Sequence, residues 1–140
     1  MPDSSWPAMA LALMCALGTA PAHAEGMLGI AFVQAPEAGA GVATGTTPDA
    51  TIAAAMAQCM QTAEAGDCIV TNWCQPAGWS IDLFVMHREG PHWHEVVCGL
   101  PSRELAESVA GLLCDLSGRE WLMLCEMVQL YDDTGTAQMD

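Results

Sequence analysis

Two stretches of the chain repeat the same order of hydrophobic and polar positions. Each has a strand-like apolar or alternating run, a turn, a second strand, a segment with apolar residues at three- and four-residue spacing, and a last apolar run. The expected elements are residues 27–33, 40–45, 48–65 and 67–74 in the first stretch and 79–86, 92–98, 103–116 and 120–130 in the second. This order predicts an α+β fold of two pseudo-repeated ββαβ units, with antiparallel sheet packed by two helices.

Both expected helices carry start and stop signals. Thr47 precedes Pro48, and Ser102 precedes a first turn that contains Glu104, which are the preferences of helix N-termini. Gly66 and Gly118 are the expected stops. We expect the inner faces to consist of Ile52, Ala55, Met56, Cys59, Met60 and Ala63 in the first helix and of Leu105, Val109, Leu112 and Leu113 in the second.

The N-terminal residues have the pattern of a secretory signal peptide. The ten apolar residues Ala8–Leu17 precede the small-residue motif Ala22-His23-Ala24, and a bilayer span would take about 20 residues. No Lys or Arg precedes the apolar run, so the alternative is an uncleaved N-terminal anchor or a buried helix. We predict a signal peptide at residues 1–24, with cleavage between Ala24 and Glu25. The mature protein would then be periplasmic or secreted, without a stable membrane span.

Cleavage leaves one domain. Residues 25–131 contain every expected helix and strand, and we predict that they form a single exported domain. Residues 132–140 carry no pattern and are expected to form a loose C-terminal tail.

The cysteines agree with export. Of seven cysteines, Cys15 lies in the predicted signal peptide, which leaves an even set of six in the mature chain, as in proteins of oxidising compartments. No C-x-x-C motif is present, so the sequence offers neither a redox dithiol nor a zinc knuckle. Six cysteines allow 15 connectivities. The pairing we favour is Cys59–Cys68, Cys74–Cys98 and Cys114–Cys125, in which helix and strand ends are stapled.

The first unit resembles a known family. The motif elements are Gly29-Ile30-Ala31-Phe32, Ala53-Ala54-Ala55 with Cys59, and Asp67-Cys68. They resemble the exported bacterial family catalogued as domain of unknown function 4189, best over residues 28–74. The chain departs from that family by its histidine-bearing hairpin and by lacking a second-unit counterpart of Cys68. The resemblance implies a small, exported, disulfide-linked domain, and it brings no catalytic residues.

The net charge of the chain limits the kinds of molecule that it can bind. The chain has 17 Asp and Glu against three Arg and no Lys, a net charge of −14, while 52% of its residues are hydrophobic. That apolar content excludes a disordered acidic tail. The negative field excludes nucleic acid and anionic membrane surfaces as partners. It favours a basic protein partner, and we predict a non-enzymatic interaction module of the inhibitor or immunity type.

A second functional hypothesis, metal binding, rests on one histidine-bearing hairpin. His87, His92 and His94 lie on or beside an expected hairpin, and His92 and His94 share one face of a strand. Imidazoles so placed are typical ligands of copper or zinc, so a periplasmic metal-binding protein is the alternative prediction. Otherwise no cofactor is expected.

Catalytic motifs are weak. No G-x-S-x-G nucleophile motif occurs. The glycines of residues 39–45 do not stand directly between a strand and a helix, as a dinucleotide site requires. Asp82 and Glu95, on adjacent expected strands, are the one carboxylate pair considered for acid–base chemistry, and solvated surface acids are the favoured interpretation. We therefore name no catalytic residue.

Overall fold

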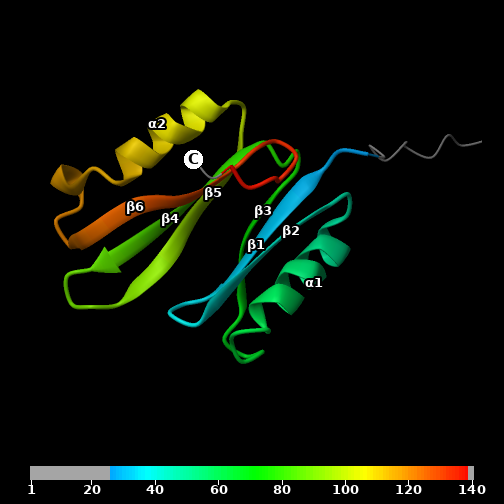
Figure 1. The fold of residues 1–140 in the computed structure, drawn as a ribbon, viewed down its shortest axis with the longest axis horizontal. Coiled ribbons are helices and arrows are strands. Elements are labelled where there is room, and N and C mark those ends of the chain that lie inside the picture. The colour runs from blue at the N-terminus through cyan, green and yellow to red at the C-terminus, as the bar shows by residue number, and fades with distance from the viewer. Residues whose placement is uncertain (1–25, 139–140) are drawn as a thin grey trace, which may run out of the picture.

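The computed structural model describes residues 26–138 (Figure 1). The predicted signal peptide, its cleavage site and Cys15 lie outside these residues. The first unit consists of β1 (Gly29–Ala35), β2 (Gly39–Gly45), α1 (Pro48–Cys59) and β3 (Ile69–Cys74). The second consists of β4 (Trp79–His87), β5 (His92–Leu100), α2 (Arg103–Leu113), a short 3₁₀ turn η1 (Leu116–Gly118) and β6 (Leu122–Tyr131).

The two units have the same topology. Each forms a three-stranded antiparallel sheet whose central strand is the first strand of the unit, in the order β2-β1-β3 for the first sheet and β5-β4-β6 for the second. The predicted α+β fold of two ββαβ units with disulfide staples is confirmed.

The helices cover the outer faces of the two sheets (Figure 1). One core lies between α1 and the first sheet around Ala31, Val33 and Ala55. A second lies between α2 and the second sheet, where Ile81 and Leu83 are fully buried. A third core joins the units and is built from Ile30, Phe32 and Ala77 with Val42, Cys74, Val96, Cys98 and Tyr131 packed against it.

The glycines of β2 serve close packing. A Cβ atom on Gly41 would collide with the backbone carbonyl of Ala55 in α1, and one on Gly39 would collide with the side chain of Thr62. Helix α1 therefore rests directly on the backbone of the outer strand β2. This close approach accounts for a glycine-rich strand that resembles a nucleotide loop only in composition.

Alanines, and not leucines, form the contact face of α2. Ala106 and Ala110 are its buried residues, Val109 and Leu113 pack at the side, and Leu105 and Leu112 are exposed. The expectation that Leu105 and Leu112 face the core is wrong, as is the same expectation for Met60 of the first helix, which is exposed. The small alanine side chains let α2 lie close to the sheet, which turns the larger residues outward.

The helix ends differ from the expectation. Helix α1 ends at Cys59 and not near residue 65. Turns follow it, in which the N–H groups of Thr62 and Ala63 donate to the Cys59 carbonyl. Thr47 stands at the N-cap position without a side-chain cap bond, and its carbonyl accepts from the Thr51 hydroxyl. Ser102 does cap α2, where its hydroxyl accepts from the Leu105 N–H at 3.3 Å.

The described part of the C-terminal segment, which was expected to be a loose tail, contains a hydrogen-bonded turn. Asp132 accepts from the N–H groups of Thr134 and Thr136, and a bridge joins Tyr131 to Ala137. The hydrogen bond from the Thr134 hydroxyl is the main cause that lowers the pKa of Asp132. This aspartate-centred turn has no hydrophobic periodicity, so pattern analysis misses it.

Three disulfides tie the elements together. Cys59–Cys68 and Cys114–Cys125 each link the end of a helix to the next strand of the same unit, and Cys74–Cys98 links β3 to β5 across the units. These pairs are the ones favoured from the sequence. Such a set indicates an oxidising compartment outside the cytoplasm.

Candidate functional site

The β4–β5 hairpin separates the three predicted metal ligands. His92 and His94 share the face of β5 that looks toward the first unit, and their rings lie 5.3 and 5.9 Å from the Phe84 ring between them. His87 belongs to the opposite face, where it stacks on Trp121 at 5.6 Å. Trp121 in turn stacks on Trp93, which packs against the core beneath α2.

No metal centre is assembled within residues 26–138. No three His, Cys, Asp or Glu side chains of this part of the chain are grouped so that they could hold a metal ion. His92 faces Glu37 with 3.5 Å between Nδ1 and Oε1, and His94 faces Asp82 at 2.7 Å, so each imidazole already has a carboxylate partner.

The carboxylate of Asp82 is the electrostatic centre of the seam between the units. Asp82 is 9% exposed. Its hydrogen bond to Nδ1 of His94 raises the pKa of His94 against the opposing effect of burial. Burial, and secondly the charge of Asp82, raises the pKa of Tyr131 to about 12. Asp82 thus favours a protonated imidazole and a neutral phenol on its two sides.

Two side chains of the first unit close the free edge of β5. The Gln34 amide donates to the carbonyl of His94 at 2.9 Å and accepts from the N–H of the same residue at 3.0 Å. The Glu37 carboxylate accepts from the N–H of His92 at 3.3 Å. These side chains take the positions that a neighbouring strand would occupy.

A cavity of about 260 Å³ lies beside this seam, between the β1–β2 turn and the β4–β5 hairpin. Phe84, His92 and His94 line one side and Glu37 the other. It contains no Ser, Thr or Cys side chain that His94 could activate as a nucleophile. The carboxylate pair considered for acid–base chemistry is split as well, because Glu95 lies on the other face of β5 and binds Arg119 at 2.6 and 3.0 Å.

The cations of the chain are engaged in internal contacts. Arg119 also donates to the Leu113 carbonyl and stacks over Trp121. Arg103 pairs with Glu107 at 2.7 Å, and Arg88 donates to the Leu122 carbonyl. Exposed carboxylates are spread over both units, namely Glu37, Asp49, Glu64, Asp67, Glu89, Glu104, Glu107, Asp115, Glu120, Glu126 and Asp133.

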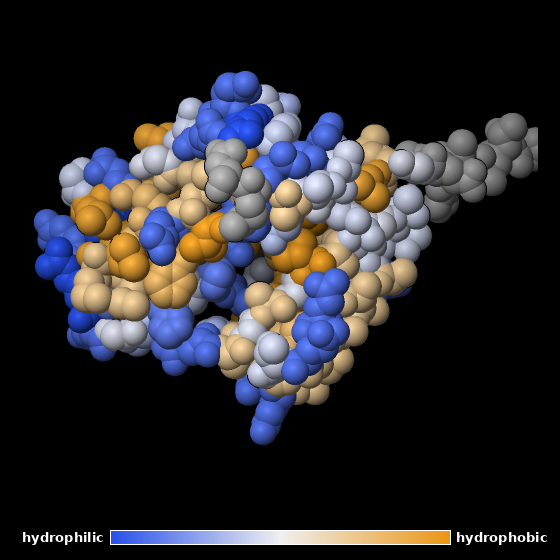
Figure 2. All heavy atoms as spheres, in the orientation of Figure 1, coloured by the Kyte–Doolittle hydropathy of each residue, from blue (hydrophilic) through white to orange (hydrophobic). Residues whose placement is uncertain are grey.

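The outer strand β6 carries an exposed apolar surface. Met123, Leu124, Met127 and Val128 are all exposed, Met123 by 57%, and we call these four residues the β6 surface. Figure 2 shows hydrophobic atoms gathered over the part of the molecule where β6 runs, bordered by polar groups. The pairing of β6 with β4 shifts register at Met123 and at Val128. Both are therefore bulged residues that point away from regular ladder positions.

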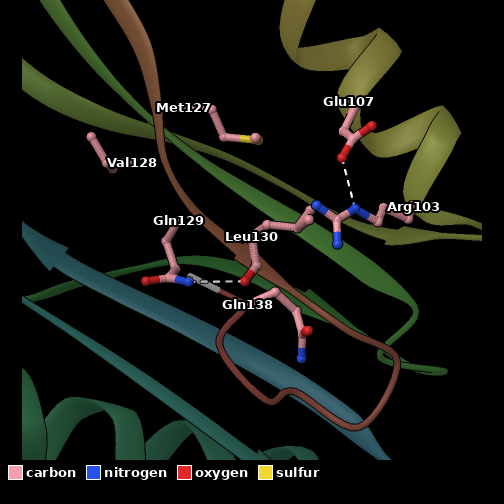
Figure 3. A pocket seen from close by; sticks show the side chains of 7 residues that line it. All are labelled: Arg103, Glu107, Met127, Val128, Gln129, Leu130 and Gln138. Atoms are coloured by element: carbon pink, nitrogen blue, oxygen red, sulfur yellow. Dashed lines mark hydrogen bonds and ion pairs between the residues drawn. The ribbon is translucent and has the colours of Figure 1, made fainter. Parts of the chain in front are cut away.

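A groove of about 260 Å³ runs along the end of β6 (Figure 3). Residues 127–130 of β6 form its floor, Arg103 and Glu107 reach in from α2, and Gln138 of the C-terminal segment closes the far side. The Gln138 N–H donates to the carbonyl of Leu130 at 2.7 Å, so the C-terminal segment already occupies that end of the β6 edge.

Sequence reasoning missed both Gln34 with Glu37 and the β6 surface. The signal for the β6 surface is present: LMLCEMV lacks the strict alternation of a strand with one buried face. Nothing local marks Gln34 and Glu37, because their partners on β5 lie 60 and 55 residues away, respectively.

No protein-family model, no curated protein and no solved structure matches the chain. The resemblance over residues 28–74 to domain of unknown function 4189 stays a prediction. Neither α1 nor α2, nor any other helix among residues 26–138, has the length and apolar character needed to cross a bilayer.

Proposed function

We propose that this chain is an exported, non-enzymatic interaction module that docks on a basic protein, in the manner of an inhibitor or immunity protein. The observation that carries the proposal is the distribution of charge: the three arginines are held in internal contacts, while most carboxylates face solvent. A surface of one sign steers an oppositely charged partner and speeds its association.

Export is part of the same proposal. The signal-peptide pattern of residues 1–24 and the even set of cysteines support it. We expect secretion through a bacterial inner membrane to yield a chain that begins at Glu25 and carries no free thiol. Intact mass and thiol labelling check both points. A secreted product that retains residues 1–24 contradicts the cleavage prediction.

The alternative of a copper or zinc protein has less geometric support. It requires His87 to join His92 and His94, and these residues lie on opposite faces of the second sheet. The favoured function therefore does not use the hairpin as a metal centre.

Salt dependence tests the docking function. We expect oligolysine to bind the chain at about 50 mM salt and to dissociate at about 500 mM. Salt screens the attraction between surface charges and shortens the distance over which it acts. Oligoglutamate of equal length is the matched control and should not bind. If oligolysine is not retained at low salt, the acidic surface does not serve docking and the proposal fails.

A further inference from the structure

The β6 edge differs from the other outer edge of its own sheet. The β5 edge is closed by Gln34 and Glu37. Along β6, the pairing given by the described residues is with β4 on one side and, on the other, only the bridge from Tyr131 to Ala137. The N–H of Leu122 donates to the Arg119 carbonyl and its own carbonyl accepts from Arg88, so the edge begins after it. The outer side of residues 123–129 therefore offers alternate backbone N–H and C=O groups to another strand.

The apolar character of this edge is unusual. Natural edge strands are commonly protected by lysine, proline or inward charges. Here the two bulged positions hold Met123 and Val128, and Met127 lies between them in the groove beside α2. Bulges that present large apolar side chains favour binding of a partner over mere protection of the edge.

The two faces of β6 differ in charge. Glu126 lies opposite Phe84 on the face away from α2, and Met127 lies opposite Leu83 on the face toward α2. Within the groove, the charge of Arg103 is matched by Glu107 at 2.7 Å. Glu120 and Asp133 flank the strand and are exposed. A strand added here would meet an apolar position on one face and a carboxylate on the other.

We propose that β6 binds an extended cationic segment of the partner by strand addition. The segment places apolar side chains beside Met127 and Val128 and Lys or Arg side chains beside Glu126. Its backbone pairs with the outer side of residues 123–129, a length of about six to eight residues. This inference rests on the proposed function and locates its docking surface.

A second copy of this chain fits less well. Antiparallel pairing of two β6 strands about their midpoint brings the two Glu126 carboxylates onto neighbouring positions, and each copy carries a net charge of −14. Like charges across adjacent strands are destabilising. Charge complementarity therefore favours a cationic segment.

The test uses a peptide of about eight residues that alternates Lys and Val, labelled for fluorescence anisotropy, with the full chain produced in an oxidising compartment. A Glu/Val peptide of the same length controls for charge. A Lys/Val peptide with N-methyl groups on alternate backbone nitrogens controls for strand addition. We expect only the unmodified Lys/Val peptide to bind, more weakly as salt rises.

Three lysine substitutions locate the surface. Met127→Lys and Val128→Lys should each weaken binding about tenfold, because they remove apolar contact and repel the cationic segment. Leu112→Lys is the matched control, since it makes the same charge change at a side chain that is 76% exposed on α2 and does not line the groove. It should leave affinity within about twofold. Circular dichroism confirms that each variant is folded.

Each other outcome overturns the inference in a distinct way. Equal weakening by all three substitutions, or binding of the N-methylated peptide, means attraction to the acidic surface without strand addition, and the proposed function then survives. Binding of the Glu/Val peptide contradicts the role of charge. A dimer in sedimentation that Met127→Lys dissociates identifies a second copy as the occupant. Failure of both Lys/Val and oligolysine to bind removes the proposed function as well.

Discussion

The two ββαβ units share a topology but close their outer strands differently. In the first unit, α1 lies directly over the outer strand β2, and the Gln58 side chain accepts from the Val42 N–H. In the second unit, α2 packs mainly over the central strand β4. The strand that corresponds to β2 is β5, whose edge is closed by Gln34 and Glu37 of the first unit, while β6 stays open. Side-chain size accounts for the position of α1, because the glycines of β2 admit the helix onto that strand. The corresponding strand β5 contains one glycine where β2 contains three. One chain order thus yields a closed edge and an open one.

The disulfides give the largest expected effect. Replacing Cys74 and Cys98 by alanine should lower the free energy of unfolding by about 3.5 kcal/mol, because this bridge closes the longest loop. The within-unit pairs Cys59–Cys68 and Cys114–Cys125 close loops of 9 and 11 residues and should each contribute about 2.7 kcal/mol. Urea unfolding measures all three.

If removing either within-unit disulfide lowers the free energy of unfolding equally, the two disulfides stabilise their units to the same extent. A loss at Cys114–Cys125 larger than at Cys74–Cys98 would contradict the view that the bridge between units dominates.

A glycine pair tests the close packing of the first unit. Gly41→Val should destabilise the protein by about 3 kcal/mol, because its side chain collides with the α1 backbone. Gly111 lies on the exposed face of α2, where an added Cβ meets nothing within 4 Å. Gly111→Ala should therefore stabilise by about 1 kcal/mol. Thermal unfolding distinguishes the expected loss of stability from the expected gain. A Gly41→Val variant with unchanged stability would refute the direct contact of α1 with β2.

The seam between the units should respond to pH. Because the folded pKa of His94 is raised, its contribution to stability is fully present below the unfolded value near 6.5 and is lost as pH rises through the folded value. The effect should stay under about 1 kcal/mol, since the imidazole is partly exposed. His94→Gln should remove this step from unfolding free energies measured between about pH 5 and pH 9. An unchanged profile in that variant would assign the step to another group.

A spectroscopic signal reports on the same carboxylate. Tyr131 is the single tyrosine of the chain, so ultraviolet absorbance follows its ionisation directly. We expect a midpoint near 12 in the folded protein and a lower midpoint in Asp82→Asn, because removing the charge makes the phenolate less unfavourable. The stability that this phenol contributes is lost as pH rises above about 10. A midpoint unaffected by Asp82→Asn leaves burial as its sole cause.

The periodicity of the sequence predicted most of the fold but few features of the surface. Strand and helix order could be predicted because alternation and three- to four-residue spacing are local properties. The contact face of α2 could not, since choosing Ala106 over Leu105 depends on how closely the helix approaches the sheet. The split of His87 from His92 and His94 likewise depends on which face of β4 and β5 each residue occupies. The β6 surface needs the register of its two bulges, which arises only when β4 pairs with it.

In the part of the chain that the structure describes, the side-chain amide of Gln34 leaves the second sheet only one edge, that of β6, at which another strand can bind. By satisfying both backbone groups of His94, it prevents β5 from templating another chain. A sheet that can accept a strand on one side alone ends an assembly and does not extend it. Occupancy of β6 would therefore produce a discrete complex with one partner segment, and no fibre can propagate through this sheet.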